Sequence, residues 1–330
     1  MTPGVSSPGP RLVRLDPSIG LSALFRPLSK SRVRPTLEVT YRRNGTDLTL
    51  HFRAPEALGM PEQTLLLTLL ELAQESLGGP DAVLDAQSVG QGAALWQALH
   101  LERPATQGVS LHLVTSIRAL ASRCGSQGGR SQQLRLAQLQ RLCAVAVEET
   151  SEATGGITRR ARLVACLPDA DGRLHLALHP RLVAAVRGVQ YAQLSLAERQ
   201  SLGTDTAQAL HAFFSTVLRP GRRLPIRVDT LIQRFWGDGG DAVPEGTLRA
   251  RRKLVRDSLE ALGALPSWSV QWRRPGLAVV QRHKTRTPRD AGRPQQRLPR
   301  LAALGGATPA LPRLDECFDT TRFLRGDAQA

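Results

Sequence analysis

The stretch EGTLRARRKLVRDSLEALG, residues 245–263, decides the fold that this sequence predicts. At 100° per residue, one stripe of a helix would gather four apolar residues, which are Leu248, Val255, Leu259 and Leu262. Thr247 is suited to cap the start of this helix, and Gly263 stands where a glycine commonly follows a helix end. Beside the apolar stripe lies a cationic face made of Arg249, Lys253 and Arg256, with Arg252 at its boundary.

The segments on either side predict a small module around this helix. Residues 225–228 form a short strand pattern, and Asp229 is placed to cap a brief helix over residues 230–236. Downstream, residues 268–272 and 277–280 flank Arg273-Arg274-Pro275-Gly276, which is typical of a β-hairpin. Helix, turn, basic helix and two-stranded wing together form a winged helix-turn-helix. Such a module puts its second helix in the DNA major groove.

A run of charges on a helix is more often only a solvated face. Here no acidic residue falls between Arg249 and Arg256, so pairing at i, i+4 inside that run cannot balance its charge. The hairpin that follows carries Arg273 and Arg274 at its tip. These two features favour a nucleic-acid contact.

The whole chain has the same bias. Its 330 residues contain 44 Lys and Arg against 28 Asp and Glu, a net charge of +16, which predicts a polyanionic partner and favours nucleic acid over a membrane. No run of 18 apolar residues occurs, and the N-terminus lacks the order of a signal peptide, so a cytoplasmic protein is expected. The four cysteines are scattered, which predicts neither a disulfide framework nor a zinc site.

An earlier part of the chain repeats the order of elements. Residues 111–114 predict a strand, Ser116 is placed to cap a short helix over 117–123, and a Gly-rich turn leads to a helix from Ser131 to about Leu142. Strand patterns follow at 144–148, 162–167 and 174–178. We therefore predict an α+β protein with two tandem winged-helix domains, a reading that rests on weak internal similarity.

The expected organisation has four parts. Residues 1–35, rich in Pro, Gly, Ser and Arg, are expected to form a flexible basic arm. The N-terminal winged-helix domain is assigned to 36–188 and the C-terminal one to 189–285, and a disordered tail to 286–330. Further elements are a hairpin around Asn44-Gly45, a helix over 64–73, a helix over 180–186 and a core-facing helix over 205–218, while residues 78–108 allow strand, loop or helix.

Several segments resemble the replication initiator protein of the RepC type found on IncQ-like plasmids. They are RLDP (14–17), LFR (24–26), LEVTY (37–41), DGRLHLALHP (171–180), TAQALH (206–211), IRVDTL (226–231) and TLRARRKLVR (247–256). The resemblance covers roughly residues 10 to 280 in the same order, with a poor match over 78–108.

The resemblance implies an initiator that binds tandem repeats, called iterons, in double-stranded DNA at a plasmid origin. Such a protein would help to melt adjacent AT-rich DNA and admit a plasmid-encoded helicase and primase. A second copy of the chain, forming a homodimer, is a further candidate partner.

The sequence lacks the motifs of the enzyme classes that could act on an origin. A rolling-circle nickase needs a His-hydrophobic-His pair and a nucleophilic Tyr. Here three residues separate His175 from His179, and Tyr41 and Tyr191 lie in no recognisable context. No P-loop, dinucleotide fingerprint, Gly-x-Ser-x-Gly or His-Glu-x-x-His occurs. We expect no enzymatic activity, no cofactor and no metal.

The candidate DNA-contacting residues lie on the two predicted recognition helices and the wing: Arg130, Gln133, Gln140 and Arg141 in the first module, and Arg249, Arg251, Arg252, Lys253, Arg256, Arg273 and Arg274 in the second. Arg suits bidentate contact with guanine, and Gln can pair with adenine. A transcriptional repressor would share every motif but bind a palindromic operator. An RNA-binding protein would show more exposed aromatics than a chain with 4% aromatic residues.

Overall fold

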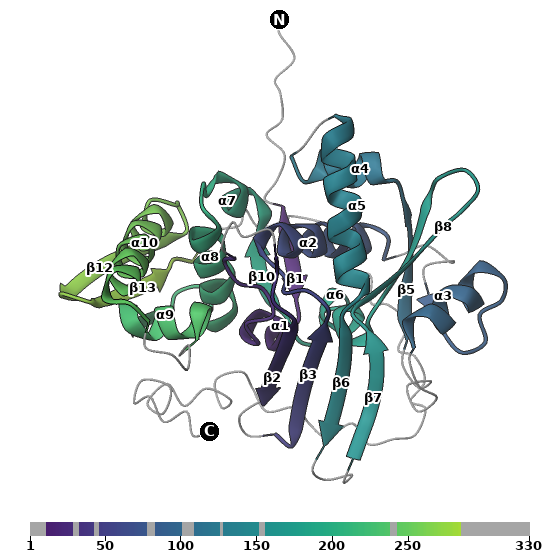
Figure 1. The fold of residues 1–330 in the computed structure, drawn as a ribbon, viewed down its shortest axis with the longest axis horizontal. Helices are drawn as coiled ribbons and strands as arrows, with labels where there is room; N and C mark the ends of the chain where they lie inside the picture. The colour runs from purple at the N-terminus through teal and green to yellow at the C-terminus, as the bar shows by residue number, and fades with distance from the viewer. Residues whose placement is uncertain are drawn as a thin grey trace, which may run out of the picture.

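The structure, a computed structural model, describes residues 11–28, 33–42, 46–77, 83–100, 109–125, 128–151, 156–237 and 243–284. It is a mixed α+β fold with several small antiparallel sheets (Figure 1). The expected tail over 286–330 and the Asn44-Gly45 turn lie outside the described residues.

The C-terminal unit has the predicted order of elements. It runs α8 (Asp205–Val217), β11 (Arg223–Arg227), α9 (Val228–Trp236), α10 (Glu245–Gly263), β12 (Trp268–Arg274) and β13 (Leu277–Arg282). The three strands form an antiparallel sheet in the order β11-β13-β12. Burial of Val255, Leu259 and Leu262 confirms the apolar stripe of α10.

Three end residues of this unit were predicted wrongly. Pro244, not Thr247, is the N-cap of α10, so the helix begins one turn earlier. Gly263 is still inside the helix, where a Cβ would meet Val270 at 3.2 Å, so this glycine permits close packing of α10 on β12. Asp229 lies in the first turn of α9 behind the N-cap Arg227.

The N-terminal unit repeats this order with an insertion. Its elements are α2 (Met60–Glu75), β5 (Ser110–Thr115), α4 (Ile117–Arg123), α5 (Gly129–Cys143), β8 (Val164–Pro168) and β9 (Leu174–Leu178). Strands β5, β9 and β8 are hydrogen-bonded neighbours in that order. This order corresponds to β11-β13-β12 in the C-terminal unit. The side chain of Ser116 accepts a hydrogen bond from the backbone of Ala119, as the predicted cap requires.

The insertion between α5 and β8 is a hairpin that belongs to another sheet. Strands β6 (Ala146–Ser151) and β7 (Gly156–Arg162) pair with the hairpin of β2 (Leu37–Arg42) and β3 (Leu48–Ala54) in the order β2-β3-β6-β7. The sequence predicted the hairpin around Asn44-Gly45 and a strand over 144–148, but no strand over 156–162. It also did not predict that these strands pair, because alternation marks a strand without saying which strand it pairs with.

The region that resisted assignment from sequence forms a small lobe. Strand β4 (Val83–Leu84) extends the β5 sheet, and α3 (Gln91–Leu99) packs on it. Leu95, Trp96 and Leu99 of α3 form a separate apolar cluster with Leu84, Ala165 and Ala177.

The flexible arm expected over 1–35 is wrong for residues 11–28. Strand β1 (Leu12–Leu15) pairs with β10 (Ala192–Ser195), and α1 (Pro17–Leu21) follows with Asp16 as its N-cap. Val13, Leu15 and Leu24 are completely or almost completely buried. The prediction failed because it used the average composition of the segment, in which a short alternating strand is not apparent. The apolar residues of that strand are buried only when the folded chain brings β10 beside it.

The two units share one hydrophobic core, which extends from β1 to β13. Two buried arginines lie where segments distant in sequence meet. Arg199 of α7 (Leu196–Ser201) donates to the carbonyl oxygens of Gln208 at 2.8 Å and Met60 at 3.4 Å. Arg282 of β13 donates to the carbonyl of Gln193 in β10 at 2.8 Å. The remaining helix, α6 (Pro180–Val186), has the predicted bounds and contacts β1.

Candidate nucleic-acid interface

The cationic side chains of α10 fall into two groups. Arg251 and Arg252 flank the buried stripe and face α9. The Arg251 guanidinium lies 5.4 Å from the ring centre of Trp236, while Arg252 contacts Asp229 at 2.8 Å and Glu245 at 3.6 Å. These contacts raise the pKa of Arg252, chiefly through the hydrogen bond to Asp229.

Intramolecular ion pairs therefore do reach the basic run, although none of them forms within it. Lys253 also pairs with Asp257 at 2.6 Å, one turn downstream. The partners Asp229, Glu245 and Asp257 all lie outside 249–256, so a search for acids within the run misses them.

Four other cations remain available to a ligand. Arg249 and Arg256 on α10 and Arg273 and Arg274 at the end of β12 are exposed, and no ion pair to them occurs within the described residues. The hairpin tip beside them turns through Gly276, whose φ of 78° is a left-handed conformation that favours glycine. Helix α10 and the β12–β13 hairpin lie at one end of the molecule (Figure 1).

In the N-terminal unit, α5 occupies the position that α10 has in the C-terminal unit. Arg130, Gln133 and Gln140 are exposed on it, as a groove-facing role requires. Exposed on the same helix are Leu134 and Leu136, which are 55% and 41% accessible to solvent and were not among the predicted contacts.

Arg141 differs from the other candidates because it is bound inside the protein. Its Nε contacts buried Glu62 at 2.8 Å, and its Nη1 lies 3.7 Å from Glu56. Burial opposes ionisation of Glu62, but the backbone N–H of Gly59 and the guanidinium groups of Arg34 and Arg141 lower its pKa. Arg141 thus fixes α5 to α2, and we remove it from the interface.

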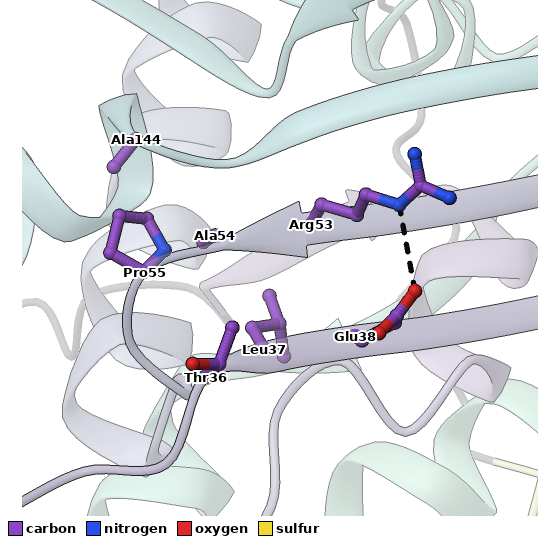
Figure 2. A pocket seen from close by; sticks show the side chains of 7 residues that line it. All are labelled: Thr36, Leu37, Glu38, Arg53, Ala54, Pro55 and Ala144. Carbon is purple, nitrogen blue, oxygen red and sulfur yellow. Dashed lines mark ion pairs between the residues drawn. The ribbon is translucent and has the colours of Figure 1, made fainter.

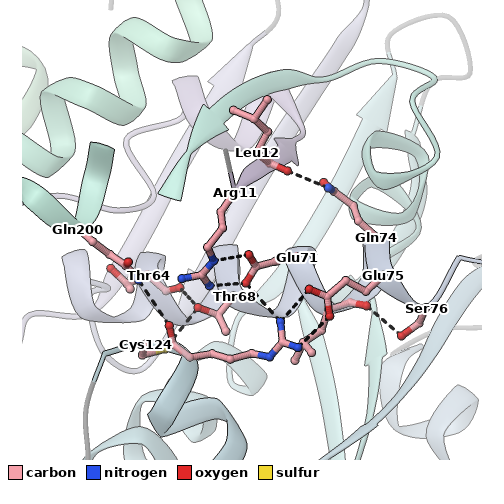
Figure 3. A network of polar contacts seen from close by, with 12 residues as sticks. Arg11, Leu12, Thr64, Thr68, Glu71, Gln74, Glu75, Ser76, Cys124 and Gln200 are labelled. Carbon is pink, nitrogen blue, oxygen red and sulfur yellow. Dashed lines mark hydrogen bonds and ion pairs between the residues drawn. The ribbon is translucent and has the colours of Figure 1, made fainter. Parts of the chain in front are cut away.

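A second ionic network fixes α4, the helix before α5, on α2. Arg123 donates to Glu75 at 2.9 and 2.8 Å. Arg11 donates from Nε to Glu71 at 2.6 Å (Figure 3). Both carboxylates lie on α2, so this helix carries the contacts that orient α4 as well as α5.

The hairpin of the N-terminal unit is not basic. Its turn between β8 and β9 contains Asp169 and Asp171 along with Arg173. His175 Nε2 contacts Asp169 at 3.1 Å, and its Nδ1 lies 3.0 Å from Nε2 of His112. Desolvation opposes ionisation of Asp169, but the backbone N–H of Arg173, the His175 side chain and the backbone N–H of Asp171 together lower its pKa.

The described residues contain no cluster of three His, Cys, Asp or Glu able to hold a metal. His175 and His179 have separate roles. His179 is the buried N-cap of α6, and its Nδ1 accepts a hydrogen bond from the backbone N–H of Arg181 at 3.2 Å. Burial, with the nearby Arg159 and Arg181, puts its pKa well below the usual value, so it is neutral.

A shallow pocket lies where β2 and β3 meet the end of α5 (Figure 2). Its lining is largely apolar, with Leu37 and Pro55, and its charged pair Glu38 and Arg53 is joined at 3.6 Å. Because this pair is exposed and neutralises itself, the described lining of the pocket offers no unpaired charge for chemistry.

No helix among the described residues is both long and apolar enough to cross a membrane. The sequence matches no curated protein. Two crystal structures of domains 2 and 3 of RctB are similar in fold at 12% sequence identity. One, from selenomethionine derivatives, has a TM-score of 0.49 and covers 80% of this chain and 96% of its own. The other has a TM-score of 0.48 and covers 81% and 97%.

The model of the Replication protein C (RepC) family matches residues 11–279. This span includes every element from β1 to α10 and most of the final hairpin. Members of this family are DNA-binding initiators of plasmid replication and are generally non-catalytic. The chain therefore belongs to the RepC family of replication initiators.

Proposed function

We propose that this chain binds specific double-stranded DNA at a plasmid origin through two tandem winged-helix modules, over residues 36–188 and 189–285. The observation that carries the proposal is the repeated order of helix, strand, helix, helix and hairpin, with one exposed polar helix in each repeat. In a winged helix that exposed helix enters the major groove.

The C-terminal module would hold the duplex through its unpaired cations. Arg249 and Arg256 on α10 are suited to guanine edges or phosphates, and Arg273 and Arg274 on the hairpin to phosphates. Arg251, Arg252 and Lys253 would contribute less to binding, because an intramolecular contact must be exchanged for each DNA contact. The N-terminal module would present Arg130, Gln133 and Gln140.

Two modules in one chain would cover about two helical turns of DNA, roughly 20 base pairs. Binding to tandem iterons would bend or strain the duplex, and that deformation would help to open a neighbouring AT-rich segment. Initiation by this route requires no covalent step from the protein. A plasmid-encoded helicase and primase would then act on the opened strands, and a second copy of the chain would occupy the next iteron.

Fluorescence anisotropy with the full chain tests this proposal. One duplex carries the direct repeats of the protein's own replicon, a second carries the same bases scrambled, and a third carries one repeat arranged as a palindrome. We expect the tightest binding to the direct repeats and a shallower salt dependence there than on the scramble. Equal, steeply salt-dependent binding to all three would contradict the proposal, and preference for the palindrome would instead support a transcriptional repressor.

A further inference from the structure

The outward face of α5 carries almost no charge. At 100° per residue, the stripe opposite buried Gln138, Leu139 and Leu142 gathers Arg130, Gln133, Leu136, Ala137 and Gln140. Arg130 is the single cation in this stripe, and Arg141 at its margin is ion-paired to Glu62. The face of α10, by contrast, includes Arg249, Lys253 and Arg256.

The hairpins of the two units also differ in charge, and the hairpin of the N-terminal unit is again the less basic one. The β8–β9 turn has Asp169 and Asp171 against one cation, Arg173; Asp171 and Arg173 are exposed and Asp169 is partly buried. The corresponding β12–β13 hairpin has Arg273 and Arg274. An acidic tip is repelled by phosphates, so the N-terminal hairpin gives its module no electrostatic anchor on DNA.

We infer that the two modules divide recognition: α5 reads A·T base pairs through amides and apolar side chains, whereas α10 and the β12–β13 hairpin anchor the phosphates. The inference rests on the proposed function, because it assumes that both modules lie on one duplex. To that proposed function the inference adds the class of base pairs that α5 contacts and the residues that read those base pairs.

The chemistry of the α5 face fits A·T pairs in the major groove. A Gln amide can donate to and accept from the N6 and N7 edge of adenine, which places Gln133 and Gln140 opposite adenine. Apolar side chains contact the thymine methyl group, a role suited to Leu136 and Ala137 between the two amides. A face without guanine-seeking arginines, apart from Arg130 near its start, has little to offer G·C pairs.

Selection from a pool of random duplexes with the full chain tests the division. We compare the wild type with Gln133→Ala/Gln140→Ala, with Arg249→Ala/Arg256→Ala, and with Gln193→Ala, a control for an exposed Gln on β10 outside both helices. We expect the wild type and the control to select one site that contains a contiguous A·T segment. The double Gln variant should lose preference in that segment alone, binding the selected site about tenfold more weakly with an unchanged salt slope.

The double Arg variant should keep the A·T preference and lose affinity on every duplex, with a smaller salt slope. If the wild type selects no sequence, both the proposed function and this inference fail. If the wild type selects a site and the double Gln variant keeps all its preferences, only the division is overturned. In that case Gln133 and Gln140 do not read bases.

Uracil in place of thymine gives a second, independent test that changes the DNA as well as the protein. Removing the thymine methyl groups from the selected A·T segment should weaken wild-type binding about fourfold per contacted base, while Leu136→Ala should be indifferent to the change. Equal sensitivity of the two proteins to uracil would overturn the role of Leu136. A wild type indifferent to uracil would likewise overturn the contact between Leu136 and a thymine methyl group.

Discussion

Among individual residues, two arginines of α10 carry the DNA-binding proposal. Because Arg249 and Arg256 have no ion-pair partner in the described part of the chain, replacing either with Ala removes a DNA contact without breaking one inside the protein. We expect either change to weaken specific binding by about 1–3 kcal/mol if the side chain reads a base. Anisotropy on the repeat duplex measures the loss.

The matched control is Arg53→Ala, which removes the same charge from the exposed face of β3, outside α10 and the β12–β13 hairpin. Arg252→Ala should weaken binding less than Arg256→Ala, since Arg252 is already bound to Asp229. Equal losses for the Arg53 and Arg256 variants would mean that only net charge matters, and would contradict the placement of the recognition helix.

His179 makes the stability of the fold depend on pH. It is fully buried and neutral, with Glu149, Arg159 and Arg181 as the charged groups around it, and its pKa lies well below 6.5. Below that pH the unfolded chain binds a proton here that the native chain does not, so stability falls as pH falls. Between about pH 7 and about pH 5 this term is about 2 kcal/mol.

His179→Asn should remove this term while keeping the N-cap of α6, because Asn is a preferred capping residue. Urea unfolding at both pH values is the measurement, and the variant should lose less stability on acidification than the wild type. Buried His211, whose pKa burial also lowers, supplies a similar term that remains in the variant. An unchanged pH dependence in the variant would show that His179 titrates normally in the folded chain.

At the scale of elements, the β12–β13 hairpin should contribute mostly through charge. Arg273→Ala/Arg274→Ala removes two exposed cations near the turn and leaves Gly276 and the strand pairing in place. If both contact phosphates, the slope of log affinity against log salt should fall in magnitude by about 1.8. Preference for the repeat over the scramble should be retained.

Gln271→Ala on the same strand is the control, since it alters an exposed neutral side chain beside the two arginines. The salt slope of this variant should equal that of the wild type. A double Arg variant whose slope is unchanged would show that the hairpin does not lie on the phosphates, whatever it does to affinity.

For the molecule as a whole, the N-terminal segment is part of the core rather than an appendage. Leu15 in β1 is 1% exposed and belongs to the cluster that continues into the C-terminal unit. Leu15→Ala should lower the free energy of unfolding by about 2–5 kcal/mol through the cavity it leaves. Because one core serves both units, we expect both units to unfold in a single thermal transition. The Leu15 substitution should shift the midpoint of that whole transition.

The control is Leu134→Ala, the same chemical change on a side chain that is 55% exposed. It should change stability by less than about 0.5 kcal/mol. If the Leu15 variant were as stable as the Leu134 variant, the result would support the flexible arm that composition predicted.

The sequence alone predicted the elements whose signals are local. The helices over 117–123 and 180–186, the Ser116 cap, the apolar stripe of α10 and its hairpin all follow from periodicity, capping and turn residues within a few positions of each other. The RepC family likewise followed from short segments in their order along the chain.

Tertiary structure decided what depends on partners distant in sequence. The β6–β7 hairpin joins the β2–β3 sheet, β1 pairs with β10 across 177 or more residues, and Arg141 is taken up by Glu62. The same holds for the basic run, where Asp229 and Glu245 neutralise Arg252 and leave Arg249 and Arg256 available. A sequence pattern reports which side chains a segment carries, but strand pairing and ion pairing are set by which surfaces the fold brings together.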